Sequence, residues 1–505
     1  MSRKPRRSAK TLRRKSPNTP DKSDAPDASH APVTPPPDPA LVPVLSAGWT
    51  TYQEGHLAQA ADMLAAACID YPASAEAHHM LGVVLLELGR PGEALKSLVT
   101  ARDLDPGRPG VHDDMGALFF TQGYLGKALE SYEKALACDG ARAETHNNLG
   151  AVYTAMGDHE NALASYRKAL ELDPGMEMAQ QNIILSLDYL PHIDIETRRN
   201  EWARWCGRFA TPTPIPDASA LRPHDNDRDP ERRLRVGYVS ADFKQHSAAR
   251  VFGGVLAHHD HDAVEVICYS GVRGEDEQTA RFRDMADHWR GVFHLSDHQL
   301  ADMVREDGVD ILVDLSGHSG GNRLSLFARR PAPLQVTAWG YAAGTGLAAM
   351  DYLFADECVI PPPETGNYEE TIVHLPCLFV AEPPADLPPV GPLLALTQNA
   401  VTFGSFNRLP KLTETTLALW AEVLAAVPES RLVLKCAEFN DQAQRRRIAG
   451  FFADRGIEDA RVEMMGKTPQ REHLEAYARV DVGLDTAPYG GGVTTLDALW
   501  MGCRW

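Results

Sequence analysis

A repeat with a spacing of 34 residues limits what this 505-residue chain can fold into more than any other feature. From residue 41 onward, small residues recur at this spacing in four columns: Gly48, Gly82, Gly116 and Gly150; Gly55, Gly89, Gly123 and Gly157; Ala60, Ala94, Ala128 and Ala162; and Ala67, Ala101, Ala135 and Ala169. Two antiparallel helices can approach closely only where the facing residues lack bulk. The columns therefore predict four stacked helix pairs over residues 41–176.

A spacing of 34 residues is typical of tetratricopeptide repeats. Such units stack into an α-solenoid whose concave face usually binds an extended peptide or a protein partner. Residues 177–211 predict a further pair of helices that caps the array. Residues 1–40 begin with nine Lys and Arg among the first 22 and continue with many prolines, which indicates a disordered arm or, alternatively, a contact with an acidic surface.

After a polar linker over 212–232, the hydrophobic pattern changes to alternating strands and helices, which predicts an α/β architecture with parallel sheets. One half covers 233–388, with strands expected at 234–240, 263–270, 292–296, 311–316 and 335–341. A second half covers 398–505, with strands expected at 400–407, 431–436, 461–466 and 482–487. Ligands of such sheets bind beyond the carboxyl ends of the strands, so we expect a cleft between the halves.

Composition narrows the class of partner and the compartment. The formal net charge of -19 opposes nucleic acid as the main partner, because that binding depends largely on basic side chains. The eight cysteines are scattered without paired spacings, which favours a reducing compartment. No apolar run has the length of a membrane span, and the N-terminus lacks the apolar core of a secretory signal. We therefore expect a cytoplasmic protein with no membrane partner.

Three clusters of polar residues follow predicted strands, where the cleft model requires them. VSADFKQHSAAR carries His246, and VDLSGHSGGNR carries Asp314 and His318. The third segment, APYGGGVTTLDALW, contributes a glycine run and polar residues at a helix start: Gly490, Gly491, Gly492, Thr494, Thr495 and Asp497. For each histidine, a hydrogen-bonded core or loop position remains the alternative.

The glycine run has the clearest physical meaning. Glycines let the backbone approach a ligand closely, and the following helix start offers unpaired N–H groups to an anion. A helix capped by Thr494 or Thr495 after a tight turn is the alternative. Lys411 also follows a strand and could neutralise a diphosphate or simply lie in solvent. The Asp-x-Asp spacings at 225–229 and 260–262 indicate solvated loops, so no metal site is predicted.

These segments resemble the glycosyltransferase family that contains O-GlcNAc transferase and the plant SPINDLY proteins. The blocks that carry the resemblance occur in the family's order, after the repeats: RVGYVSADFKQH, ILVDLSGHSGGNRLSLFARRPAPLQVTAWGY, FGSFNRLPKLT, VPESRLVLK and VDVGLDTAPYGGGVTTLDALWMG. The resemblance covers roughly residues 41–502. It implies a GT-B catalytic region, made of two Rossmann-like half-domains, behind the tetratricopeptide solenoid.

The resemblance also implies roles for individual residues. His246 corresponds to a proposed base or active-site histidine, while Asp314 and His318 would lie beside the sugar. Lys411 corresponds to the lysine that contacts the nucleotide diphosphate. The remaining nucleotide-sugar positions are His473, Thr494, Thr495 and Asp497, together with the backbone of Gly491 and Gly492. The family is inverting and independent of metal, so no cofactor is expected.

The implied function is transfer of N-acetylglucosamine from UDP-GlcNAc to Ser or Thr of a protein acceptor. Two alternatives stay open: another donor, such as GDP-fucose or a sugar used on bacterial flagellin, and a repeat scaffold with a vestigial catalytic region. Family members continue beyond ALWMG, whereas this chain ends at CRW, so we expect a C-terminal truncation. An incomplete second half would expose an apolar helix, and we expect this product to have low stability and little or no activity.

Overall fold

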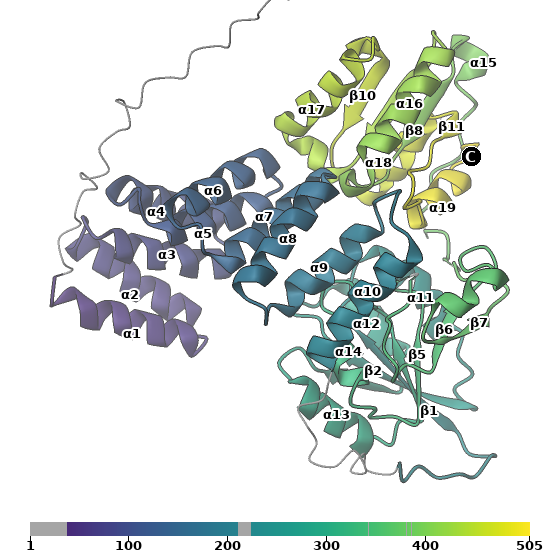
Figure 1. Ribbon diagram of the computed structural model, residues 1–505, viewed down its shortest axis with the longest axis horizontal. Coiled ribbons are helices and arrows are strands. Elements are labelled where there is room, and N and C mark those ends of the chain that lie inside the picture. Colours follow the sequence, from purple (N-terminus) through teal and green to yellow (C-terminus); the bar gives the residue numbers. More distant parts are fainter. Residues whose placement is uncertain (1–37, 211–223, 342, 380, 385, 505) are drawn as a thin grey trace, which may run out of the picture.

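The computed structural model describes residues 38–210 and 224–504, apart from 342, 380 and 385. The predicted arm up to residue 37, and the part of the predicted linker up to residue 223, lie outside the described residues. In Figure 1 the helices α1 to α10 form an elongated array. Two α/β halves lie beside the C-terminal end of this array, one above the other in that view.

Four helix pairs form the repeat array, as the small-residue columns predict: α1 (Leu41–Gln53) with α2 (Leu57–Asp70), α3 (Ala75–Glu87) with α4 (Pro91–Leu104), α5 (Pro109–Thr121) with α6 (Leu125–Cys138), and α7 (Ala143–Met156) with α8 (His159–Leu172). The first glycine column lies where the two helices of a unit cross. A Cβ on Gly116 would be 2.7 Å from the ring of Tyr132, and one on Gly150 would be 2.5 Å from Tyr166. The second glycine column makes the left-handed turn between the two helices.

Two further helices end the array. They are α9 (Glu177–Leu187) and α10 (Ile195–Trp205), which begins at the cap Asp194 and continues into a π-helical turn, η1 (Cys206–Ala210). Trp202 and Trp205 of α10 are buried in the core of the first α/β half. The capping helices therefore belong to the repeat array and to the catalytic region together.

The first half contains a parallel sheet of seven strands in the order β3-β2-β1-β4-β5-β6-β7. The strands are β1 (Leu234–Ser240), β2 (Val264–Ser270), β3 (His288–Gly291), β4 (Ile311–Asp314), β5 (Leu334–Thr337), β6 (Tyr352–Ala355) and β7 (Thr371–His374). Helices α11 (Ser247–Ala257), α12 (Glu277–Asp284), α13 (Asp297–Glu306) and α14 (Leu324–Phe327) connect them.

The strand predicted at 292–296 is wrong. Residues 292–296 form the loop after β3, and Ser296 caps the start of α13. Val292 is buried in the core, which explains the apolar pattern that suggested a strand. β3 has the sequence HWRG and lies at the edge of the sheet, so no apolar alternation marks it.

The second half has a smaller parallel sheet in the order β10-β9-β8-β11. The strands are β8 (Thr402–Ser405), β9 (Arg431–Lys435), β10 (Val462–Met465) and β11 (Val482–Gly483), with α16 (Glu414–Ala426), α17 (Gln442–Ala453), α18 (Gln470–Glu475) and α19 (Val493–Trp500) beside them. Arg504 forms a parallel bridge to Val482, next to β11. The fold is thus the predicted α-solenoid followed by two α/β half-domains.

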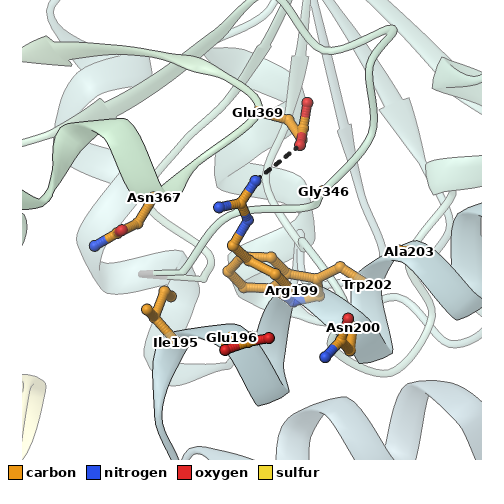
Figure 2. A pocket seen from close by; sticks show the side chains of 9 residues that line it. All are labelled: Ile195, Glu196, Arg199, Asn200, Trp202, Ala203, Gly346, Asn367 and Glu369. Atoms are coloured by element: carbon orange, nitrogen blue, oxygen red, sulfur yellow. Dashed lines mark ion pairs between the residues drawn. The ribbon is translucent and has the colours of Figure 1, made fainter.

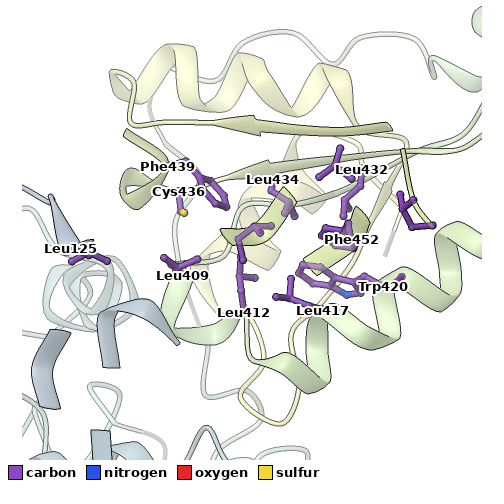
Figure 3. Close-up of a cluster of buried hydrophobic side chains, with 14 of the residues drawn as sticks. Leu125, Leu409, Leu412, Leu417, Trp420, Leu432, Leu434, Cys436, Phe439 and Phe452 are labelled. Atoms are coloured by element: carbon purple, nitrogen blue, oxygen red, sulfur yellow. The ribbon is translucent and has the colours of Figure 1, made fainter. Parts of the chain in front are cut away.

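One hydrophobic core joins the repeats to the second half. Leu125, Leu149 and Val152 of the third and fourth units belong to the same buried cluster as Leu409 and Leu412. Figure 3 shows Leu125 close to Leu409 in this cluster. Across the described residues, no helix is long and apolar enough to cross a membrane.

Candidate functional site

Lys411 ends a short 3-10 turn, η4 (Leu409–Lys411), that follows β8. Its Nζ donates to the carbonyl oxygen of Gly490 at 2.7 Å and lies 4.6 Å from the centre of the Tyr489 ring. Burial lowers the pKa of Lys411 to about 8, an effect that Asp485 opposes and Arg408 reinforces. Lys411 is therefore not a solvated surface lysine; it is held against the glycine run.

The glycine run lies between β11 and α19 and is fixed from two sides. Gly491 N donates to Asp485 Oδ1 at 2.6 Å, and Thr416 of α16 donates to the carbonyl of Ala487 at 2.8 Å. A Cβ on Gly491 would be 2.3 Å from Thr495 Oγ1 and 3.1 Å from Thr494 Oγ1. Only glycine allows the backbone to pass this close to both hydroxyls.

Neither threonine caps α19. The N-cap residue is Gly492, with no side-chain cap, so the capped-helix alternative for Thr494 and Thr495 is wrong. Thr494 instead donates to Asn407 Oδ1 at 2.9 Å. Thr495 Oγ1 is buried and has no hydrogen-bond partner among the described residues. The first turn of α19 thus keeps unpaired N–H groups and one unpaired hydroxyl beside the glycine run.

Asp497 connects the two halves. Its buried carboxylate accepts a two-pronged hydrogen bond from Arg250 of α11, at 3.0 Å to Oδ2 and 2.8 Å to Oδ1. Arg250 also lies 5.8 Å from the ring of Trp500. This pair brings α11 and α19 close together, and it means that the carboxylate of Asp497 is already paired.

His473 of α18 lies against Phe406 and Tyr477, with ring centres 5.6 and 5.7 Å away. Burial lowers the pKa of His473, and the positive charges of Lys435 and Arg250 lower it further, so the ring is neutral at pH 7. Tyr477 donates to the carbonyl of Thr494 at 3.1 Å. His473 is therefore next to the start of α19; its role in nucleotide binding stays a prediction.

His246 is the N-cap of α11, one turn before Arg250. Its Nδ1 lies 3.3 Å from both Ala248 N and Asp242 Oδ2, and the side chain is 42% exposed. The exposed ring is thus carried by the same helix that meets α19 through Arg250 and Asp497.

Asp314 and His318 lie elsewhere in the first half, and both are buried. Asp314 accepts hydrogen bonds from Gly317 N and Thr337 Oγ1, each at 2.8 Å, so its carboxylate holds the turn after β4. His318 Nε2 lies 2.9 Å from the carbonyl of Thr345, and burial lowers the pKa of His318 to about 4. No described hydrogen bond or ring contact joins either residue to His246.

Two pockets open near the capping helices. A pocket of ≈ 380 Å³ lies between α9 and the loop after β4, and is lined by Met178, Asn182, His318, Gly321 and Asn322 among others. A larger one of ≈ 430 Å³ contains none of the predicted site residues. Figure 2 shows it between α10 and the segment that carries Asn367 and Glu369. The guanidinium of Arg199 points toward the carboxylate of Glu369, 3.7 Å away.

The structure thus gathers Lys411, Gly491, Thr494, Thr495, Asp497 and His473 around the start of α19, with Gly492 as its N-cap. Asp314 and His318 are buried at and after the end of β4, where the sheet register places Asp314 beside Val239 of β1. Sequence reasoning missed Arg250, Asn407, Asp485 and Tyr489. Arg250 occurs in the quoted VSADFKQHSAAR segment, four residues after His246, a spacing that places both on one helix face. Asn407 and Tyr489 had no comparable signal, because their partners come from distant segments.

Known proteins share both parts of this architecture. The family model described as glycosyl transferase family 41 matches residues 217–384 and 393–505. Tetratricopeptide repeat models match 45–109, 116–157 and 143–176. A Thermobaculum terrenum O-GlcNAc transferase mutant has a solved structure that is 36% identical, with a TM-score of 0.78 over 85% of this chain and 81% of that chain.

Curated relatives match between about half and two thirds of this chain. The probable UDP-N-acetylglucosamine–peptide N-acetylglucosaminyltransferase SPINDLY of Petunia hybrida is 37% identical over 337 residues, which are 66% of this chain and 36% of the relative. The corresponding SEC protein of Arabidopsis thaliana is 32% identical over 282 residues, 54% of this chain and 28% of the relative. This chain thus spans about a third of the length of these relatives. The family model covers more than half of the chain, and the predicted resemblance is confirmed: this chain belongs to glycosyl transferase family 41.

Proposed function

We propose that this chain is a protein O-glycosyltransferase. It would transfer N-acetylglucosamine from UDP-GlcNAc to a Ser or Thr hydroxyl of a protein acceptor, with inversion at the anomeric carbon. The proposal rests on one observation: Lys411, the glycine run and the unpaired Thr495 hydroxyl lie together at the start of α19. An ammonium group and a helix N-terminus together stabilise a diphosphate, which is the leaving group of this reaction.

Transfer forms a bond between the acceptor oxygen and the anomeric carbon and breaks the bond from that carbon to the diphosphate. Lys411 uses one of its three N–H groups on Gly490, which leaves two for phosphate oxygens. The acceptor proton would pass to a donor phosphate oxygen, or to Nε2 of His246 in the tautomer whose Nδ1–H points to Asp242. In that tautomer Nδ1 gives up the hydrogen bond that it accepts from Ala248 N as the cap of α11. Asp314 and His318 would act as positioning residues, because both are buried.

The repeats would bind the acceptor protein, with no role for nucleic acid or a membrane. We propose that no metal takes part, as the family resemblance implies; no group of three His, Cys, Asp or Glu among the described residues could hold an ion. A cytoplasmic location is proposed because all eight cysteines are free thiols.

Calorimetric titration of the purified chain with UDP, UDP-GlcNAc and GDP-fucose tests the proposal. Lys411→Met removes the ammonium but keeps a stem against Tyr489. Lys168→Met is the matched control, because it removes the same charge from an exposed lysine of the fourth repeat. We expect wild type and control to bind UDP-GlcNAc and Lys411→Met to lose most of the affinity. Preference for GDP-fucose would favour the alternative donor, and binding of no nucleotide would favour the scaffold.

A further inference from the structure

The fourth repeat touches the turn that carries Lys411, although the two are about 250 residues apart. His159 Nε2, at the start of α8, lies 2.7 Å from the carbonyl oxygen of Pro410. We propose that His159 and Tyr189 are positioning residues that hold Lys411 toward the donor diphosphate, so that the end of the repeat array supports the donor site. This inference rests on the proposed function, in which Lys411 contacts that diphosphate.

His159 contributes a directional hydrogen bond. Because a carbonyl can only accept, Nε2 is the donor, and Nδ1 is left buried without a partner among the described residues. The residue is 2% exposed, and burial lowers the pKa of His159, so the ring stays neutral at pH 7. The same position in the other three units holds Leu57, Pro91 and Leu125. The repeat fold therefore does not require a histidine at this position, whereas the hydrogen bond to Pro410 does require one.

A series of rings continues from His159 to Lys411. The ring of Tyr189 stacks on His159 with centres 4.3 Å apart and planes at 1°. Tyr189 in turn lies 5.0 Å from the ring of Tyr489, over which Lys411 Nζ is held. The neighbouring Asp188 accepts a hydrogen bond from Tyr341 of the first half at 2.6 Å, which fixes the chain at Tyr189.

The turn of the fourth unit also contacts the segment just before Lys411. A Cβ on Gly157 would be 2.9 Å from the carbonyl oxygen of Leu409, whereas one on Gly55, Gly89 or Gly123 would meet nothing within 4 Å. All four glycines have positive φ. Of these four glycines, only Gly157 therefore lies against the segment before Lys411.

The rings and the charges around Lys411 set its titration together. Asp485, Arg408 and Tyr489 face the ammonium group, and Tyr189 and Asp188 lie behind Tyr489. Removing the Tyr189 ring would admit water to this side, which would raise the pKa of Lys411 toward its ordinary value. A change in packing alone, without a link to Lys411, would leave that titration where it is.

The test compares three variants, His159→Leu, Tyr189→Leu and Gly157→Ala, with the control Gly123→Ala. Gly123 and Gly157 both have φ of 79°, so both alanines carry the same backbone strain. UDP-GlcNAc binding is measured by calorimetry between about pH 7 and pH 9.5, a range set by the ordinary pKa of lysine, and thermal midpoints report folding. We expect both alanine variants to fold, with the lower midpoint for Gly157→Ala because its Cβ would lie 2.9 Å from the carbonyl oxygen of Leu409. Donor binding should be about tenfold weaker for Gly157→Ala and His159→Leu, and as in wild type for Gly123→Ala. Tyr189→Leu should raise the pH above which UDP-GlcNAc binding weakens.

Wild-type affinity and an unchanged pH profile in all three variants would overturn the inference and leave the proposed function standing. Loss of binding in wild type as well would overturn the proposed function, and this inference with it. Should one variant fail to fold, the other two decide the outcome.

Discussion

At the scale of single residues, Lys411 illustrates how burial tunes a lysine that we propose contacts the donor phosphates. A lysine binds phosphate only while protonated, and the free side chain stays protonated well above neutral pH. Burial lowers the pKa of Lys411 to about 8, so its charge disappears within the range where most proteins are stable. Affinity for the donor should therefore be sensitive to pH at this one residue.

We predict that UDP-GlcNAc binding is strongest below pH 8 and weakens by up to about tenfold per pH unit above it, because one proton must be taken up by Lys411 for binding. Calorimetry across this range measures the effect. Lys411→Arg is the control, since arginine keeps its charge throughout. An equally steep loss of binding in Lys411→Arg would assign the titration to another group.

The placement of site residues was predictable from the sequence where one segment holds all the groups. The glycine run and the two threonines of α19 are such a case, and they lie beside Lys411 as the cleft required. The support of Lys411 was not predictable, because His159, Tyr189 and Tyr489 come from three distant segments and no local pattern joins them. The burial of His318 likewise was not predictable, because the ring beside it, 5.1 Å away, belongs to Trp205 of the capping helix α10.

At the scale of elements, the helices of the repeats followed from the sequence because their period extends over four units. The strands could be predicted from the sequence only in part. β6 and β7 have four residues each and were not predicted, and β3 was placed a few residues too late. β3 and β7 are the two edge strands of the sheet and are only partly buried, so no apolar run marks them, and β6 pairs with the edge strand β7.

Two helical glycines allow a direct test of repeat packing. Gly150→Ala should destabilise the array by about 1–3 kcal/mol, since the added methyl would meet the Tyr166 ring at 2.5 Å. Gly92→Ala should stabilise it by about 0.5–1 kcal/mol, because a Cβ there meets nothing within 4 Å and alanine favours the helix. Thermal unfolding of the two variants checks the opposite signs; shifts in the same direction would contradict this account of the glycine column.

At the scale of the whole molecule, a paired charge joins the two halves. The Asp497 carboxylate is 4% exposed and Arg250 is 28% exposed. Removing Arg250 would leave a buried carboxylate without its partner. The ion pair between Arg273 and Glu87, which joins the repeats to the first half, is exposed to solvent and serves as a comparison.

We predict that Arg250→Ala costs about 3–5 kcal/mol of stability and raises the KM for the donor, because α11 and α19 lose their contact. Arg273→Ala, at a pair with side chains 71% and 38% exposed, should change stability by less than about 1 kcal/mol. Thermal midpoints and donor kinetics of both variants test this. Equal midpoints would mean that the buried pair does not hold the halves.

The hydrophobic core shared by the third and fourth repeats and the second half limits how this chain can be recombined with others. The first and second units pack in a separate cluster that reaches only the third unit. A chimera that receives its first two units from another tetratricopeptide protein should keep the catalytic region intact. One that also exchanges the third and fourth units would have to bring matching residues for Leu409 and Leu412. Units can therefore be exchanged most readily from the outer end of the array.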